Sequence, residues 1–249
     1  MPAIAPPPFA RPGIAPLPRR LPPVVPLPGR SLADYLRWFA LDAHALRGRD
    51  VLDVAAGLSS FTAEACARKI NAVAVDPIYG ESAESLAAAS LPSFPPDVIA
   101  AELSSNVRRA GASAVIPDFD RDAGAPVQRF LNDYEAHFMH NRYVRASLPR
   151  LPFFDGTFDV VLCAHLLFTG ERRWDFDWTL AAVVELVRVS AGEVRLYPLS
   201  EVSGKTCSGL PRLRRALKDA GIESELRPSA ADAGSAPAGS TLVLRKVAA

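Results

Sequence analysis

The sequence predicts an α/β protein in which helices cover both faces of a mostly parallel sheet whose last strand is antiparallel. Two apolar runs, 51–54 and 72–75, are each followed by a helical or loop segment, as buried parallel strands usually are. The last two predicted strands, 222–227 and 241–247, have no helix between them, which favours a terminal hairpin. With 249 residues and a hydrophobic content of 49%, the chain can bury one large core.

The amino-terminal part of the chain divides into a tail and the start of a folded domain. Residues 1–30 hold 11 of the 23 prolines, so we expect a mostly disordered tail before a domain that covers 31–249. A helix is expected to begin at Ser31, and a second helical stretch is expected to end at Gly48. The expected elements that follow are a strand at 50–54, a helix at 60–69 and a strand at 72–75.

Residues 81–141 are longer than an ordinary connection between two parallel strands. The segments 97–111 and 126–140 have helical character. A break at 92–96 precedes the first segment, and a break around Pro117 separates the two. We therefore expect a helical cap insertion that acts as a mobile lid over the active site.

The remainder of the chain returns to alternating strands and helices. The helix predicted at 174–189 has an apolar face formed by Leu180, Val183, Val184 and Val187. The other expected elements are strands at 143–145, 158–163, 193–197, 222–227 and 241–247, and a helix at 210–220 that Gly221 ends.

The segment V-L-D-V-A-A-G-L-S-S-F at 51–61 is the most informative motif. Its strand carries Asp53, turns at Gly57 and leads into a helix, and a second strand ends at Asp76 a little over 20 residues later. This layout is typical of a nucleotide-type cofactor site, in which an acid after the second strand binds ribose hydroxyls. The turn departs from G-x-G-x-x-G, because Ala55 stands where the first glycine would be.

A third block carries a family resemblance. Residues 151–161, L-P-F-F-D-G-T-F-D-V-V, resemble the segment before the fourth strand of class I S-adenosylmethionine-dependent methyltransferases. With 51–61 and A-V-D-P at 74–77, this gives three blocks in the order of that superfamily. Within it, A-A-G-x-S-S-F, S-L-P-x-L-P-F and E-V-R-x-Y-P-L resemble a bacterial group. The resemblance implies a Rossmann-like seven-stranded methyltransferase sheet, S-adenosyl-L-methionine as cofactor, and methyl transfer to an oxygen or nitrogen of a small-molecule acceptor.

The resemblance also implies which residues bind the cofactor. Asp76 would hold the ribose, and Asp53 would bind the cofactor's amino group or tie the turn together. Ser147 stands where many relatives have an acid for the adenine amino group, so its hydroxyl or the Leu148 backbone would substitute. The full expected set is Asp53, Ala55, Gly57, Ser59, Asp76, Pro77, Ser147, Leu148 and Cys163.

His165 follows the predicted fourth strand, where the sheet opens onto the substrate. It is the candidate general base, because histidine commonly titrates near neutral pH, and it is equally a candidate for simple packing against the cofactor. Tyr134, His137 and His140 lie on the predicted cap helix and are candidates for the acceptor side.

Composition and missing motifs exclude several function classes. A net charge of +1 and no clustered basic and aromatic residues argue against a nucleic-acid partner. No [DN]-P-P-[YFW] motif follows the fourth strand, which argues against methylation of amino groups in DNA bases or protein glutamine, and the lack of a Pro-Cys motif argues against cytosine C5 methylation. No run of 18 apolar residues is present, so no membrane-spanning helix is expected. Three widely spaced cysteines suggest neither a disulfide framework nor a metal site, so a cytoplasmic protein is expected.

Two other function classes stay open at this point. A nicotinamide-dependent oxidoreductase could use the same Asp53 and Asp76, although the missing glycines and the terminal hairpin argue against it. A degenerate methyltransferase-like domain that only binds or scaffolds is compatible with Ala55 and Ser147, since both depart from the usual pattern.

Overall fold

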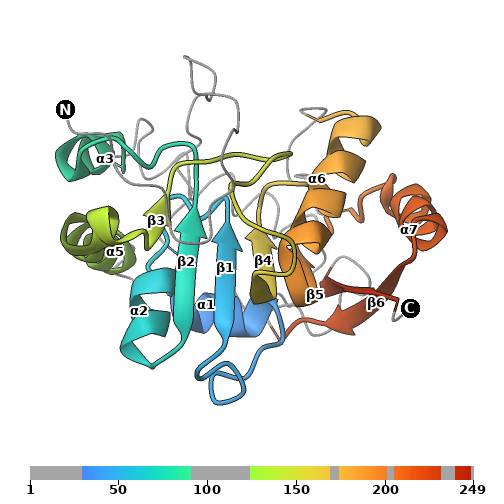
Figure 1. Ribbon diagram of the computed structural model, residues 1–249, viewed down its shortest axis with the longest axis horizontal. Helices are drawn as coiled ribbons and strands as arrows, with labels where there is room; N and C mark the ends of the chain where they lie inside the picture. The colour runs from blue at the N-terminus through green and yellow to red at the C-terminus, as the bar shows by residue number, and fades with distance from the viewer. Residues whose placement is uncertain (1–29, 91–123, 169–173, 201–204, 231–238, 248–249) are drawn as a thin grey trace, which may run out of the picture.

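The computed structural model describes residues 30–90, 124–168, 174–200, 205–230 and 239–247. Seven strands form one sheet in the order β3-β2-β1-β4-β5-β7-β6 (Figure 1). The strands are β1 (Asp50–Val54), β2 (Asn71–Val75), β3 (Tyr143–Val144), β4 (Phe158–Ala164), β5 (Ser190–Tyr197), β6 (Ile222–Pro228) and β7 (Ser240–Lys246). β1 to β5 are parallel, and β7 is antiparallel to both β5 and β6. The predicted fold class, including the antiparallel seventh strand, is confirmed.

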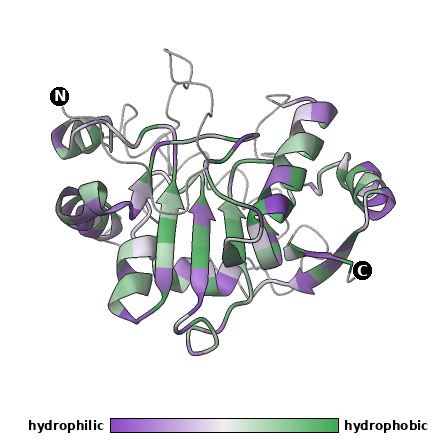
Figure 2. Cartoon of the chain, in the orientation of Figure 1, coloured by the Kyte–Doolittle hydropathy of each residue, from purple (hydrophilic) through white to green (hydrophobic). Residues whose placement is uncertain are grey.

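Helices cover both faces because side chains of the central strands alternate between two apolar layers. Val51 and Val160 pack with α1 (Leu32–Trp38) and α2 (Phe61–Ala67). On the other face, Leu52 and Val161 pack with α6 (Phe176–Val189) and α7 (Leu210–Asp219). In Figure 2 the central strands are largely hydrophobic (green), whereas α5 and α7 carry many hydrophilic residues (purple).

A third apolar cluster surrounds β2 and β3 at the edge of the sheet. It joins Ala74 and Tyr143 to Leu86 of α3 (Ala83–Ser90) and to Phe130 of α5 (Gly124–His137). α5 is followed by the short helix η1 (Phe138–His140) and leads directly into β3. It is therefore the crossover helix before a parallel strand, packed beside the sheet, whereas the sequence assigned 126–140 to the cap. The rest of the predicted cap, including 97–111, lies outside the described residues.

Most element ends lie within one or two residues of the expected positions, and two differences are larger. Within the described residues, no helix lies between α1 and β1, although one was expected to end at Gly48. Ala40 adopts a left-handed conformation, with φ of 50°, and this turns the chain out of the helix. The second difference is β5, which begins at Ser190 instead of residue 193 and pairs with β4 through an irregular register.

None of the helices in the described ranges combines the length and apolar character that a membrane-spanning segment requires.

Candidate functional site at the carboxyl ends of β1, β2 and β4

The strand register brings the predicted cofactor residues to one edge of the sheet. Val54 at the end of β1 pairs with Val75 of β2 on one side and with Cys163 of β4 on the other. The chain leaves β1 toward β2 on one side and returns through β4 on the other, so the strand order reverses between β1 and β4. In open α/β sheets, ligands bind at the carboxyl ends of strands at such a switch point.

The turn after β1 is tightly bent. Ala55 has φ of 58° and Gly57 has φ of 54°, both in the left-handed region. Glycine adopts this conformation at no steric cost, but alanine does not. Ala55, which stands where the first glycine of G-x-G-x-x-G would be, thus adopts the left-handed conformation itself. Such non-glycine residues concentrate at functional sites.

Asp76 ties this turn to the end of β2. Its Oδ2 accepts a hydrogen bond from the Gly57 amide at 2.9 Å, and its Oδ1 accepts one from the Ile78 amide at 3.1 Å. The Tyr79 hydroxyl donates to the Gly57 carbonyl at 2.8 Å, so both backbone groups of Gly57 are held by the segment after β2. Burial raises the pKa of Asp76, and the two amide hydrogen bonds oppose that shift.

Asp53 lies on β1 and is fully buried. Its Oδ1 accepts a hydrogen bond from the Tyr35 hydroxyl at 3.0 Å, while its Oδ2 accepts none from any described residue. Burial raises the pKa of this carboxyl to about 7, although the charge of Arg30 and the Tyr35 hydrogen bond act in the opposite direction. A buried carboxylate oxygen without a partner is costly, and it is a natural acceptor for a donor group on a ligand.

Arg30 is the main residue that the sequence did not identify. It was assigned to the disordered tail, but its side chain is only 5% exposed and reaches the ends of both β1 and β4. No local pattern marks it, because the hydrogen-bond partners of its side chain lie between 25 and 134 residues away along the chain. The folded domain therefore begins at least one residue earlier than expected.

Ser59 has a structural role in the described contacts. Its hydroxyl donates to the Arg30 carbonyl at 3.0 Å and accepts from the Phe61 amide at 3.1 Å, at the start of α2. The neighbouring Ser60 hydroxyl donates to Glu64 at 2.6 Å. The Ser59 side chain thus fixes the start of α2 against Arg30, and the Ser60 side chain binds Glu64 within the helix.

His165 directly follows β4 and has a left-handed backbone with φ of 54°. The edge of its ring packs against Trp38, with 4.8 Å between centroids, and against Tyr197, with 5.7 Å between centroids. Burial, assisted by the positive charge of Arg30, lowers its pKa to about 3. The imidazole is therefore neutral at physiological pH and a weak general base, which favours the packing interpretation.

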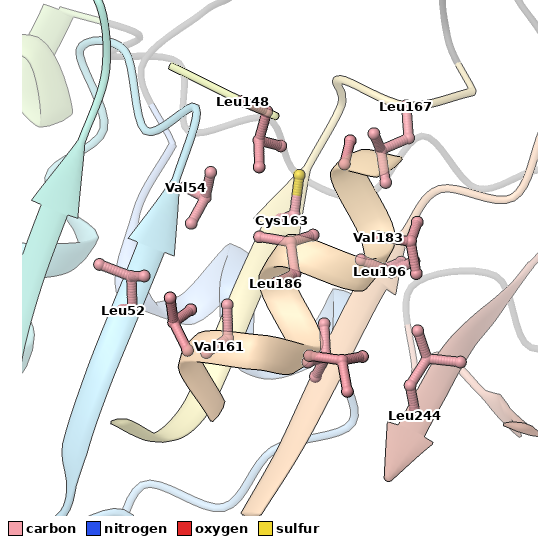
Figure 3. Close-up of a cluster of buried hydrophobic side chains, with 14 of the residues drawn as sticks. Leu52, Val54, Leu148, Val161, Cys163, Leu167, Val183, Leu186, Leu196 and Leu244 are labelled. Carbon is pink, nitrogen blue, oxygen red and sulfur yellow. The ribbon is translucent and has the colours of Figure 1, made fainter. Parts of the chain in front are cut away.

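Of the other expected cofactor residues, Ser147 and Pro77 lie at the carboxyl edge of the sheet, and Cys163 lies in the apolar core. Ser147 is partly buried beyond the end of β3, and its carbonyl accepts from the Arg150 amide at 3.3 Å. Cys163 points into the apolar layer between β4 and α6, close to Leu186 and below Leu148 (Figure 3). Burial raises the pKa of the Cys163 thiol to about 12, so this side chain is a core group. Pro77, directly after Asp76, is partly buried at the edge.

Tyr134 does not present a free hydroxyl to an acceptor. The hydroxyl accepts from the Gly80 amide at 2.9 Å and donates to the Glu81 carbonyl at 3.0 Å. The ring is 2% exposed and packs among Tyr79, Phe130 and Tyr143. Tyr134 thus fastens α5 to the segment after β2.

His137 and His140 lie at the opposite edge of the sheet from Asp53 and Asp76. His137 Nδ1 lies 3.1 Å from Asp133 at the carboxyl end of α5. His140 lines a cleft of about 530 Å³ together with Asp50 and Asn71, which begin β1 and β2. The two histidines lie beside the beginnings of the strands because a crossover helix runs antiparallel to the strands and ends where the next strand begins. The structure therefore does not bring these histidines to the predicted site.

Comparisons with known proteins add one sequence relative and several structural likenesses. No protein-family profile matches the chain. An uncharacterised protein of Methanocaldococcus jannaschii is 24% identical over 193 residues, which cover 76% of this chain and 85% of that protein.

The similar solved structures include three methyltransferases. One is a magnesium protoporphyrin IX methyltransferase from Synechocystis PCC 6803 with bound S-adenosylmethionine (13% identity, TM-score 0.42, 86% of this chain and 76% of that one). The second is a 1,6-didemethyltoxoflavin-N1-methyltransferase from Burkholderia thailandensis (16%, 0.41, 84% and 76%). The third is a TehB-like methyltransferase from Corynebacterium glutamicum (14%, 0.44, 82% and 84%). Because these TM-scores are below 0.5, the fold assignment rests on the sheet order of the chain itself.

Proposed function

We propose that this chain binds S-adenosyl-L-methionine at the carboxyl ends of β1, β2 and β4 and transfers its methyl group to an oxygen or nitrogen of a small-molecule acceptor. The observation that carries the proposal is the pair of buried acids at the switch point. Asp76 follows β2 and borders the left-handed turn at Ala55 and Gly57. Asp53 lies on the neighbouring strand, β1. The sequence blocks at 51–61, 74–77 and 151–161 support it independently.

The hydrogen-bonding capacity of the two acids fits this cofactor. Each Asp76 oxygen accepts one backbone amide, and a carboxylate oxygen can accept a further bond, here from a ribose hydroxyl. Asp53 Oδ2, which has no partner among the described residues, can accept from the α-ammonium group. Pro77 and Ile78 would pack near the adenine, and Ser147 or the Leu148 backbone would bind its amino group.

The residues at this edge act by holding and orienting the reactants. When bound, the cofactor supplies an electrophilic methyl group on a sulfonium. Much of the rate of such a transfer can come from proximity and alignment of the acceptor. His165, with its pKa lowered to about 3, would form part of the pocket wall beside Trp38 and Tyr197. An acceptor that is already deprotonated needs no base.

Replacement of Asp76 tests the site directly. We expect Asp76→Ala to weaken binding of S-adenosylhomocysteine by roughly 1.5–3 kcal/mol, because it removes hydrogen bonds to a charged group. Asp76→Asn should lose less, since its amide oxygen can still accept one of the two backbone amides. Isothermal titration calorimetry on folded variants measures the effect.

The matched control is Asp50→Ala. Asp50 begins β1 at the opposite edge, where its carboxylate accepts from Asn71. This variant should bind S-adenosylhomocysteine as the parent does. Equal affinity of the Asp76→Ala variant and the parent would rule out the ribose assignment. Cofactor binding without methyl transfer to any member of an acceptor panel would instead favour the degenerate binding domain.

A further inference from the structure

The Arg30 guanidinium bridges the two turns on either side of the switch point. Its Nη2 donates to the carbonyls of Ala55 at 3.0 Å and Ala56 at 2.7 Å, in the turn after β1. Its Nη1 donates to the carbonyl of Ala164 at 3.3 Å, at the end of β4. These three contacts connect strands that are neighbours in the sheet but more than 100 residues apart in the sequence.

The main chain of Arg30 is fixed as well. Its carbonyl accepts from the Ser60 amide at 2.8 Å and from the Ser59 hydroxyl at 3.0 Å. Both ends of the residue are therefore anchored, one to the start of α2 and the other to the turns. A side chain held this way can impose geometry on what it contacts, because its own freedom is already lost.

The contacted turns contain two strained residues. Ala55, whose carbonyl Arg30 binds, has φ of 58°, and His165, which follows the bound carbonyl of Ala164, has φ of 54°. L-residues other than glycine rarely adopt this conformation, and they keep it only when the surroundings enforce it. The guanidinium is the one side chain described that donates to a carbonyl in both turns.

We propose that Arg30 is a positioning residue whose guanidinium holds the turns after β1 and β4 in the left-handed conformations that the proposed cofactor site requires. The predicted effect on binding rests on the proposed cofactor site, whereas the predicted effect on the turns does not. Without the bridge, the two turns relax and fewer molecules present this site in its binding-competent form. The apparent affinity then falls by the fraction of competent molecules.

Arg195 provides a matched control within the same chain. It is also buried, at 7% exposure, and its Nη1 donates to the carbonyls of Phe39 at 2.5 Å and of the left-handed Ala40 at 2.8 Å. It thus holds a comparable turn, but at the end of α1 and not at the switch point. Arg195→Met removes a buried arginine of the same kind without touching the turns at Ala55 and His165.

The first measurement needs no ligand. The ¹³Cα and ¹³Cβ chemical shifts of Ala55 and His165 report their backbone conformation in the full-length chain. We expect left-handed shifts in the parent and in Arg195→Met, and a change at both residues in Arg30→Met. If Arg30→Met does not fold, Arg30→Lys carries the test, because lysine keeps the charge but lacks the planar fork that reaches several carbonyls. Unchanged shifts in the folded variant would overturn the proposal.

The second measurement separates positioning from a merely structural loss. Arg30→Met should weaken S-adenosylhomocysteine binding about tenfold, as expected if about one molecule in ten keeps the competent turns. In an Ala55→Gly background the same replacement should cost only about threefold, since glycine adopts the left-handed conformation without strain. An equal loss in both backgrounds would show that Arg30 does not act through this turn.

The two measurements fail separately. If the parent chain does not bind S-adenosylhomocysteine, the proposed function is wrong, and the chemical shifts still decide whether Arg30 holds the turns. If the parent binds and Arg30→Met binds equally well with unchanged shifts, the cofactor site stands and the role of Arg30 is refuted.

Discussion

Asp53 and His165 both interact electrostatically with the buried Arg30. Burial shifts the pKa of each side chain in the direction that favours its neutral form. The pKa of Asp53 rises from 3.8 to about 7, and the pKa of His165 falls from 6.5 to about 3. The two groups therefore contribute opposite slopes to stability as the pH changes.

The signs follow from the protons bound in each state. Between about pH 4 and 7, the folded chain holds the Asp53 proton that the unfolded chain has released, so this group makes stability fall as the pH rises. Between about pH 3 and 6.5, the unfolded chain holds a proton on His165 that the folded chain lacks. This group makes stability rise with pH over that range.

Two isosteric variants test these slopes. We expect Asp53→Asn to make the free energy of unfolding rise more steeply with pH than in the parent between pH 4 and 7. His165→Gln should change the slope in the opposite direction below pH 6.5. Urea denaturation at several pH values measures both. If Asp53→Asn has the same slope as the parent, the Asp53 carboxyl is already ionised in the folded chain and its raised pKa is refuted.

The positions of the predicted cofactor residues could be inferred from the sequence where neighbouring residues mark them. Asp53 lies near the end of a predicted strand, Gly57 lies in the turn after it, and Asp76 directly follows the next strand. The structure brings all three to the carboxyl edge of the sheet. Arg30, Tyr35 and Tyr79 act through contacts with residues far along the chain, so no local pattern reveals them.

At the scale of elements, strands and their order were more predictable than the placement of helices on the connection from β2 to β3. Apolar runs with flanking turns mark β1, β2 and β4 clearly. The sequence also marks α5 as a helix, but its pattern does not show in which direction the helix runs along the sheet. A helix that leads into a parallel strand must end at the amino edge of the sheet, and this places His137 and His140 away from Asp76.

This placement predicts that the two histidines do not contribute to cofactor binding. We expect a His137→Ala/His140→Ala variant to bind S-adenosylhomocysteine within about twofold of the parent, because distant sites without shared partners act independently. Asp76→Ala, measured in parallel by calorimetry, shows the size of a genuine site effect. A loss in the double histidine variant as large as that of Asp76→Ala would mean that the carboxyl end of α5 reaches the ligand.

At the scale of the whole molecule, the sheet order combines a switch point between β1 and β4 with an antiparallel β7 inserted between β5 and β6. The switch point is where open α/β sheets bind their ligands, and many cofactor-binding folds share it. The antiparallel β7 distinguishes this sheet from an all-parallel dinucleotide fold. The terminal hairpin was predictable, because a short polar loop without a helix can join only antiparallel neighbours.

Calorimetric titration of the full chain with S-adenosyl-L-methionine and, separately, with NAD decides whether the carboxyl edge of the sheet is an S-adenosyl-L-methionine site. We predict saturable binding of one S-adenosyl-L-methionine per chain and no heat of binding with NAD. Binding of NAD in place of S-adenosyl-L-methionine, or of neither ligand, would show that this assignment is wrong.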